Sequence, residues 1–358
     1  MDERDIFFFG SKKIKKKTTA TNLQRDPQHF KESKPQVIIS RPTAEVDYGT
    51  DNPHVGLAIV LNQKYVKGQT VRKGTEKDGT DIKASLENYG FEVRVYNDLT
   101  RNKISQLLKS VAAEDHSQFD CFVLVAMTHG DKGKIGAADE FYSTEELWEP
   151  LLGEKCPTLL GKPKIFFIQA CRGKRVDEPV MMRIALRSAF SSRSESYEHA
   201  TYAIPSTADL LVMYSTFEDY YSFRNSVTGS WFIQSLCSIL NESAKAEEAE
   251  TEGVEFFRLL TAVNRKVAYE YQSYHTSELY DQKKEMPNFM STLTKTFYLK
   301  RKHKKVNPTI NAIPEVEGDK DEDDKNKDGK DEDDKYENDT FKKIDRIFNQ
   351  NKNDLIFC

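Results

Sequence analysis

The chain is poor in the residues that build disulfide-linked or zinc-binding scaffolds. Its 358 residues include five cysteines, an odd number, and no two of them stand in a Cys-x-x-Cys spacing. This pattern argues against a disulfide framework and against a zinc site, and it favours a reducing compartment.

Long apolar stretches are also missing. No run approaches the roughly 20 apolar residues that span a bilayer, and the amino terminus lacks the pattern of a signal peptide. We therefore expect a cytoplasmic protein with no membrane partner. The net charge is only −4, which gives no general reason to expect nucleic-acid binding.

Charge is concentrated at the two ends of the chain. Residues 1–36 are polar and carry a run of lysines between Lys12 and Lys17, so we expect a short disordered basic leader, with an import signal or an anion-binding patch as the alternative. Residues 304–358 include an acidic, lysine-interspersed tract that cannot bury a core. This tail is expected to be disordered as well.

Two short patterns in the tail suggest more than a solvated segment. Asp324 to Gly329 imitate the first half of an EF-hand loop, but Lys335 stands where a bidentate glutamate is required. We therefore expect no metal ion and no other cofactor. Residues 341–348 have apolar residues at helical spacing, which fits a short amphipathic helix that docks on a partner or on the domain itself.

Between the ends, apolar runs of strand length alternate with helical patterns. This order predicts an α/β fold with a mostly parallel sheet covered by helices on both faces. Local signals for helix ends are Gly90, Thr100 as an N-cap, and Ser143 with Glu146 as a capping box before a helix that Pro150 ends. Strands are expected at 55–61, 91–96, 121–127, 165–168, 210–214 and 293–299, and the main helices at about 80–89, after 100, 231–240 and 256–271.

Cys171 is the candidate nucleophile. The run 165–168 is uninterrupted, apolar and too short for a helix, so it predicts a central strand buried on both faces. It breaks into Gln169, Ala170, Cys171, Arg172 and Gly173, which puts the thiol at the carboxyl edge of the sheet, the usual location of sites in open α/β folds. A small apolar core residue is the alternative interpretation, and the polar neighbours argue against it.

His129 is the best partner for that thiol. It follows the second buried run, 121–127, and precedes Gly130 and Asp131. If the two strands are neighbours, the imidazole and the thiol meet at one edge of the sheet, which is the geometry of a Cys/His pair. A histidine at a strand end is otherwise more often structural.

These segments together resemble the caspase family of aspartate-specific cysteine proteases. Residues 169–173, Gln-Ala-Cys-Arg-Gly, match the local signature of the family, with His129 upstream. The resemblance extends from about Val37 to Leu299, includes 214–216, 220–225 and 229–237, and is closest to executioner caspases. It implies a six-stranded, mostly parallel sheet flanked by helices on both faces.

The resemblance also assigns roles to residues. It implies that the backbone N–H groups of Gly130 and Cys171 hold the oxyanion, and that Arg72, Gln169 and Arg224 enclose the carboxylate of the substrate aspartate. Guanidinium forks suit a planar carboxylate, and a buried arginine pair without an anion would repel itself. Positions that match neighbouring substrate subsites are Tyr221, Phe223, Asn225, Trp231 and Tyr280, with aromatic core packing as the alternative for Trp231.

The chain departs from the executioner pattern beside this pocket. Phe223 stands where executioners usually have tryptophan, and Phe217, Glu218 and Asp219 differ as well. The preference beyond the cleaved aspartate therefore stays open, and Glu218 with Asp219 is expected to disfavour very acidic peptides. No third catalytic carboxylate is evident from the residues.

The resemblance divides the chain into a large-subunit part (37–173), an intersubunit linker (174–201) and a small-subunit part (202–303). In the family this linker is cut, and the candidate cleavage positions here are Asp177, Glu195 and Glu198. We expect a zymogen, activated by an upstream protease, that forms a homodimer of cleaved heterodimers, acts in apoptosis on protein substrates and is open to inhibitor proteins. Nucleic acid is not an expected partner.

Two alternatives remain at this point. A catalytically weak homologue would act as a binding scaffold or decoy, whereas the intact Cys171 and His129 favour an enzyme. A cysteine hydrolase specific for basic residues would need acidic groups where Arg72 and Arg224 stand.

Overall fold

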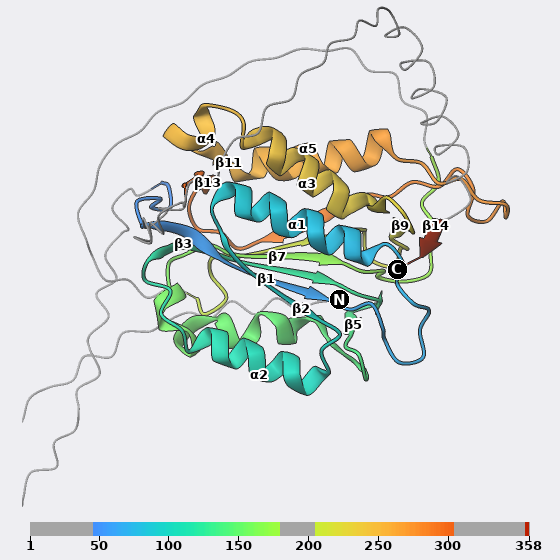
Figure 1. Cartoon of the computed structure of the whole chain (residues 1–358), viewed down its shortest axis with the longest axis horizontal. Coiled ribbons are helices and arrows are strands. Elements are labelled where there is room, and N and C mark those ends of the chain that lie inside the picture. The colour runs from blue at the N-terminus through green and yellow to red at the C-terminus, as the bar shows by residue number, and fades with distance from the viewer. Residues whose placement is uncertain (1–45, 180–204, 304–354, 358) are drawn as a thin grey trace, which may run out of the picture.

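A computed structural model describes residues 46–179, 205–303 and 355–357 and contains a six-stranded sheet (Figure 1). The strand order is β12-β8-β7-β3-β1-β2, and every neighbouring pair is parallel except β12 with β8. The α/β class and the mostly parallel sheet are thus confirmed. The strands are β1 His54–Asn62, β2 Glu92–Asn97, β3 Phe119–Met127, β7 Lys164–Gln169, β8 Leu210–Tyr214 and β12 Asn288–Ser291.

Helices lie on both faces of this sheet (Figure 1). One face carries α1 (Thr75–Tyr89), α3 (Trp231–Ser243), the short α4 (Glu248–Thr251) and α5 (Phe256–Glu270). The other face carries α2 (Arg101–Ala112) and four 3₁₀ turns. These turns are η1 Thr144–Leu147, η2 Glu149–Leu151, η3 Gly153–Lys155 and η4 Pro157–Leu159.

Three small sheets complete the described fold. Next to the carboxyl edge of the main sheet, β4 (Gly130–Asp131), β5 (Lys134–Gly136) and β6 (Phe141–Ser143) form an antiparallel unit. A second small sheet contains β9 (Phe223–Asn225), β10 (Gly229–Ser230) and β14 (Leu355–Phe357). The third pairs β11 (Val254–Glu255) with β13 (Tyr298–Leu299).

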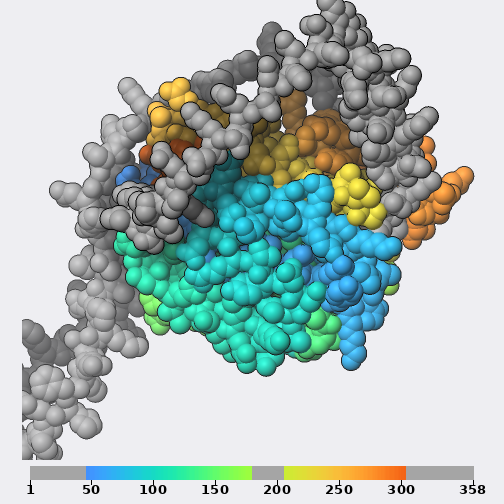
Figure 2. Space-filling model, in the orientation of Figure 1, coloured from blue at the N-terminus to red at the C-terminus, as the bar shows by residue number. Residues whose placement is uncertain are grey.

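The central strands bury both of their faces because helices cover the sheet on each side. In β1, Leu57, Ile59 and Leu61 pack toward the α2 layer, whereas Ala58 and Val60 pack toward the layer of α1, α3 and α5. Successive strand residues point to opposite faces, so one strand contributes to two cores. Figure 2 shows the cyan surface around α1 beside yellow surface from the second half of the chain, in accord with the packing of α1 on α3.

Two of the expected helices begin or form differently from the prediction. The helix expected from about residue 80 begins five residues earlier, at Thr75, so Gly79 lies inside it. Glycine permits close packing there, since a Cβ at Gly79 would meet the Asn62 side chain at 3.2 Å. Gly90 ends this helix with a left-handed φ of 101°, as predicted. The capping box of Ser143 and Glu146 is present, but it opens the 3₁₀ turn η1 and not an α-helix.

The prediction of a last strand at 293–299 is wrong. The sixth strand is β12, which begins five residues before the predicted range, and within that range the only strand is Tyr298–Leu299, which belongs to a different sheet. Between them the chain turns, held by Thr294, whose hydroxyl donates to Asp209 at 2.7 Å. Strand β12 is a partly exposed edge strand, so it lacks the apolar pattern of the buried strands.

Several predicted segments lie outside the described residues. These are the leader 1–36, most of the linker 174–201 with Glu195 and Glu198, the EF-hand-like segment 324–335 and the proposed helix at 341–348. Of the predicted tail 304–358, the structure describes 355–357, which form β14. Across the parts that are described, no helix combines the length and the hydropathy that a membrane crossing demands.

Asp78 links α1 to the start of α3. The carboxylate is fully buried and accepts hydrogen bonds from the Ser230 N–H at 2.9 Å, from the Ser230 hydroxyl and from Gln234 Nε2 at 3.0 Å. Because Asp78→Ala leaves these buried donors without their acceptor, we expect a loss of about 2–4 kcal/mol in the free energy of unfolding, measured by urea denaturation.

Asp81 on the same helix is the matched control. It forms a surface pair with Lys77 at 2.7 Å, so Asp81→Ala is expected to change stability by less than about 0.5 kcal/mol. Equal losses for the two variants would contradict a special role for the buried carboxylate.

Candidate active site

The pairing of β3 with β7 positions both proposed reactive residues. In the parallel register Met127 lies opposite Gln169, and the Thr128 N–H then donates to the Gln169 carbonyl at 3.0 Å. His129 and Cys171 each follow two residues after this last pair, so the two strands deliver them to neighbouring positions at the carboxyl edge. Both residues line one cleft of about 520 Å³, together with Thr70, Gly130 and Tyr221.

The Cys171 thiol lies against the backbone that leads into β9. Its Sγ accepts a hydrogen bond from the Ser222 N–H at 3.3 Å and is 3.7 Å from the Ser222 carbonyl oxygen. The loop after Cys171 is held by backbone pairing: the Arg172 N–H donates to the Tyr220 carbonyl at 3.0 Å, and the Tyr221 N–H donates to the Arg175 carbonyl at 2.8 Å. The thiol is therefore fixed between the end of β7 and the start of β9.

The other cysteines in the described residues have the properties of core residues. Cys121, Cys156 and Cys237 are buried free thiols. Burial raises the pKa of each of them, for Cys237 to about 12, which disfavours the nucleophilic thiolate. Cys171 differs because it lines the cleft beside a histidine.

His129 is oriented by a backbone carbonyl. Its Nε2 lies 2.6 Å from the Thr70 carbonyl oxygen, and because a carbonyl only accepts, Nε2 carries the proton and donates it. In the neutral ring, Nδ1 is then the acceptor. Thr70 thus has the orienting position for which the residues alone offered no candidate, and a backbone group leaves no mark in a sequence.

The imidazole is held in its neutral form. The pKa of His129 is lowered to about 4: burial is the largest cause, the hydrogen bond to Thr70 opposes it, and the positive charges of Arg72 and Arg224 add to the lowering. The influence of both guanidinium groups indicates that they lie close enough to His129 to act on it electrostatically.

Gly130 allows the segments that carry His129 and Cys171 to approach each other. A Cβ at this position would collide with the Cys171 carbonyl oxygen and would lie 2.8 Å from the Ala170 Cβ. Only glycine fits there without moving the Cys171 loop. The backbone of Gly130 and that of Cys171 are consequently in direct contact, beside the cleft.

The three residues predicted to hold a carboxylate are all fully buried in one region. Arg72 Nη1 donates to the Gln63 carbonyl at 3.0 Å and to the Thr75 hydroxyl at 2.7 Å. Arg224 Nε donates to the Lys73 carbonyl at 2.8 Å, one residue after Arg72. These bonds to neutral acceptors fix both guanidinium groups while leaving their positive charge uncancelled by those partners.

Gln169 is connected to the same region through Ser222. Its Nε2 donates to the Ser222 hydroxyl at 2.7 Å, and the backbone of Ser222 contacts the Cys171 thiol. Ser222 therefore links Cys171 to Gln169. A second residue absent from the prediction, Glu285, is buried and accepts the Phe223 N–H, which holds β9 in place.

Aromatic rings line the region next to β9. Phe223 stacks on Trp231 with a centroid distance of 4.7 Å, and Tyr221 meets Tyr280 edge to face at 6.2 Å. Phe223 and Trp231 are 1% and 5% exposed, so they pack in the core as well as beside β9. Asn225 also has a local role, since its Oδ1 accepts the Val227 N–H at 2.8 Å in the turn between β9 and β10.

The two acidic residues that depart from the executioner pattern have cationic neighbours. Lys132 Nζ lies 3.4 Å from Glu218 and 3.3 Å from Asp219, and Arg172 lies 3.8 Å from Glu218. The Arg172 guanidinium also stacks over the Tyr214 ring at 3.9 Å. These contacts partly offset the negative charge of Glu218 and Asp219. The expected preference against acidic peptides depends on that charge.

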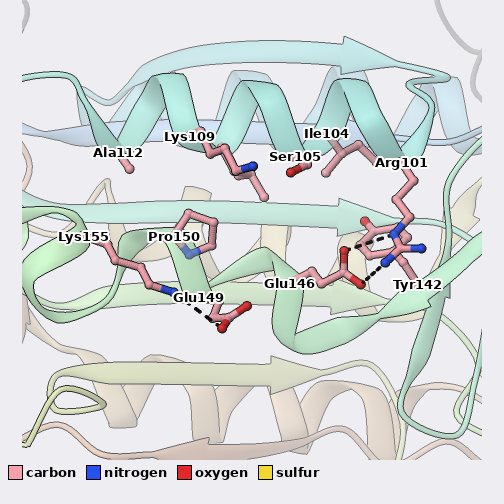
Figure 3. A pocket seen from close by; sticks show the side chains of 11 residues that line it. Arg101, Ile104, Ser105, Lys109, Ala112, Tyr142, Glu146, Glu149, Pro150 and Lys155 are labelled. Carbon is pink, nitrogen blue, oxygen red and sulfur yellow. Dashed lines mark hydrogen bonds and ion pairs between the residues drawn. The ribbon is translucent and has the colours of Figure 1, made fainter.

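A second pocket of about 520 Å³ lies between α2 and the turns η1 and η2 (Figure 3). Arg101 in its wall binds Glu146 at 2.9 Å, and Lys155 binds Glu149 at 3.5 Å. None of the predicted site residues lines it. Within the described ranges, no group of three or more His, Cys, Asp or Glu side chains is arranged to hold a metal ion.

Comparisons with known proteins agree with this geometry. The sequence profile of the caspase domain matches residues 55–298. The chain is 38% identical to Caspase-7 of Gallus gallus over 266 residues, which cover 74% of this chain and 82% of that protein. It is 39% identical to Caspase-3 of Oryctolagus cuniculus over 254 residues, which cover 70% of this chain and 86% of that protein.

A solved structure is similar as well. The crystal structure of Caspase-1 from Spodoptera frugiperda superposes with a TM-score of 0.64 at 32% identity, covering 74% of this chain and 98% of that one. The region that the caspase-domain profile matches, 55–298, holds both strand ends, the buried arginines and β9. From the profile match, the related sequences and the shared fold, the chain belongs to the caspase family of cysteine proteases.

Proposed function

We propose that this chain is a cysteine endopeptidase that cleaves proteins after aspartate, made as a zymogen and acting in apoptosis in the manner of executioner caspases. The observation that carries the proposal is the cleft that Cys171 and His129 share, close to the buried guanidinium groups of Arg72 and Arg224. A cytoplasmic location, proposed from the cysteine pattern, accords with such a role.

In the proposed mechanism the reaction passes through a thioester. The Cys171 sulfur attacks the scissile carbonyl while its proton passes to His129 Nδ1, and the backbone N–H groups of Gly130 and Cys171 stabilise the oxyanion. The imidazolium then donates that proton to the leaving amine as the C–N bond breaks. Water, deprotonated by His129, hydrolyses the thioester and regenerates the thiol.

The proposed specificity follows from the charge of the buried arginines. Arg72 and Arg224 present guanidinium groups that suit a planar carboxylate, and Gln169 supplies an amide beside them. A lysine or a neutral side chain in their place would leave two buried positive charges uncompensated, which costs several kcal/mol. The sequence offers no acidic residue at these two positions that would support specificity for basic side chains.

Activation is proposed to require cleavage within 174–201. The Asp177 carbonyl accepts the Lys284 N–H at 2.9 Å, and Glu178 binds Lys283 at 2.7 Å, so the bond after Asp177 is held at the protein surface until these contacts open. Asp177, Glu195 and Glu198 all stay candidates. Mass spectrometry of the ends of the mature subunits decides among them.

Dimerisation of the cleaved chains is part of the proposal. Strand β12 is at the end of the six-stranded order and pairs with β8 alone among the described strands. Its Met290 is 50% exposed. An edge strand of this kind offers backbone groups to a second strand, which supports an interface with another copy along β12.

The first test is hydrolysis of fluorogenic peptides that end in aspartate, by protein with a cleaved linker. Cys171→Ala is expected to abolish turnover. Arg224→Ala is expected to lower kcat/KM by about 10²- to 10³-fold, because truncating one partner of a buried charge pair typically removes about 3–4 kcal/mol. Peptides with lysine in place of aspartate should not be cleaved.

Arg101→Ala is the matched arginine control. Arg101 lines the pocket in Figure 3, and its ion pair with Glu146 is partly exposed, so its removal should leave kcat/KM unchanged within about twofold. Absence of Cys171-dependent turnover after linker cleavage would refute the protease and favour the binding scaffold.

A second test concerns the proton on His129. Because burial lowers the pKa of the folded-state imidazole to about 4 from its ordinary 6.5, the unfolded chain binds more protons between these values. The folded state should therefore lose roughly 3 kcal/mol of stability as the pH falls from 6.5 to about 4. The measurement is urea denaturation across this range, together with NMR titration of the imidazole.

His129→Gln isolates this contribution. The variant lacks the titrating group, so its free energy of unfolding should fall less over the same range. The additional loss of stability in the wild type should occur between pH 6.5 and about 4. If the free energies of unfolding of the two proteins fell in parallel with pH, the pKa of His129 would not be lowered in the folded state.

A further inference from the structure

Strand β9 is the middle strand of its small sheet. On one side it pairs with β10, with Asn225 opposite Gly229. On the other side it pairs antiparallel with β14, a segment from the far end of the chain, with Leu355 opposite Asn225, Ile356 opposite Arg224 and Phe357 opposite Phe223. Figure 1 shows β14 (dark red) beside β9. The edge of β9 that faces away from β10 is therefore occupied.

The directions of the backbone N–H groups in β9 show which residues face β14. The Phe223 N–H donates to Glu285, so it is not available to β14. Because N–H groups of alternate strand residues point to opposite edges, the ladder with β14 uses Arg224, whose partner is Ile356. The Ser222 N–H, two residues before Arg224, points to the same side.

The edge of β9 that pairs with β14 is also the edge that faces the proposed nucleophile, Cys171. The Ser222 N–H reaches Cys171 Sγ at 3.3 Å. Because β14 runs antiparallel to β9, its Phe357 end is the end that lies toward Ser222 and Cys171. An extended peptide that adds to this edge as a strand, with its scissile bond at Cys171, would use the same backbone groups of β9. A substrate and β14 cannot occupy the edge together.

We propose that residues Leu355–Phe357 are an intramolecular competitor of peptide substrates, bound as a strand to the substrate edge of β9. This inference rests on the proposed function, since it takes β9 as the substrate edge. The backbone pairing of all three residues with β9 is the observation on which the proposal is built.

The segment has the backbone of a ligand but lacks the side chain of a substrate. Leu355, Ile356 and Phe357 contain no carboxylate, so the segment offers nothing in these residues for Arg72 and Arg224 to bind. It pairs without supplying the aspartate at which the enzyme would cut. Because residues 304–354 join it covalently to the domain, its competition is intramolecular and does not depend on protein concentration.

The test uses the full chain with its linker cleaved. Ile356→Pro removes the N–H that pairs with Arg224, and Asn351→Pro is a matched proline in the same tail outside β14. If the segment occupies the edge nine-tenths of the time, Ile356→Pro should lower KM for an aspartate peptide about tenfold. The kcat value should not change, because saturating substrate displaces a competitor, and Asn351→Pro should match the wild type.

A second measurement does not depend on catalysis. In the Cys171→Ala chain, hydrogen exchange of the Arg224 amide should be about tenfold faster with Ile356→Pro than without it. Equal KM values with equal exchange rates would overturn the proposal. A KM difference that grows with protein concentration would assign the segment to a second copy and overturn its intramolecular form.

The proposed protease function and the proposed competitor role of β14 can be refuted independently. If no form of the chain hydrolyses the peptide, the protease assignment is lost, while exchange at Arg224 still decides whether β14 covers β9. If all forms hydrolyse it with the same KM and the exchange rates agree, the protease stands and the competitor does not.

Discussion

The parallel hydrogen-bond register between β3 and β7 is the constraint on which the site depends. Met127 opposite Gln169 sets where both strands end, and a shift of one residue would turn every side chain of one strand to the other face of the sheet. Because helices cover both faces of these strands, such a shift would move side chains from one core into the other and disrupt the packing of both. The packing of the core thus also fixes the relative position of His129 and Cys171.

Burying two arginines is energetically costly for this fold. Arg72 and Arg224 are fully buried, and the described hydrogen bonds go to neutral oxygens of Gln63, Thr75 and Lys73. These contacts satisfy guanidinium donors without cancelling charge, and desolvating a cation is costly. Retaining such a pair in the core makes sense if an anion is to bind there, which accords with the proposed specificity.

Much of this arrangement could be predicted from local patterns in the sequence. The buried runs identified five strands to within one or two residues at most ends, and Gly90 and Thr100 marked helix ends because their capping chemistry is local. The edge strand β12 was missed because a partly exposed strand has no buried periodicity. Strand β14 was missed because its partner, β9, lies far away in the chain.

Within the site, the limits of prediction have a similar origin. The reactive and basic side chains were predicted from their residue types and the family resemblance, and their roles remain predictions. Thr70 acts through a carbonyl, and Ser222 contacts Cys171 through its backbone. Every residue has these groups, so no residue type indicates them. Their importance depends on three-dimensional position alone.

The electrostatic coupling between the arginines and His129 has a consequence for selectivity. After burial, the guanidinium charges contribute to the low pKa of His129 and make the imidazolium costly to form. An aspartate seated between them would cancel that repulsion and make protonation of the ring easier at the moment when the leaving amine needs a proton. A bound aspartate peptide would thus promote its own cleavage. Discrimination between aspartate and other side chains would then arise in the chemical step and not only in binding affinity.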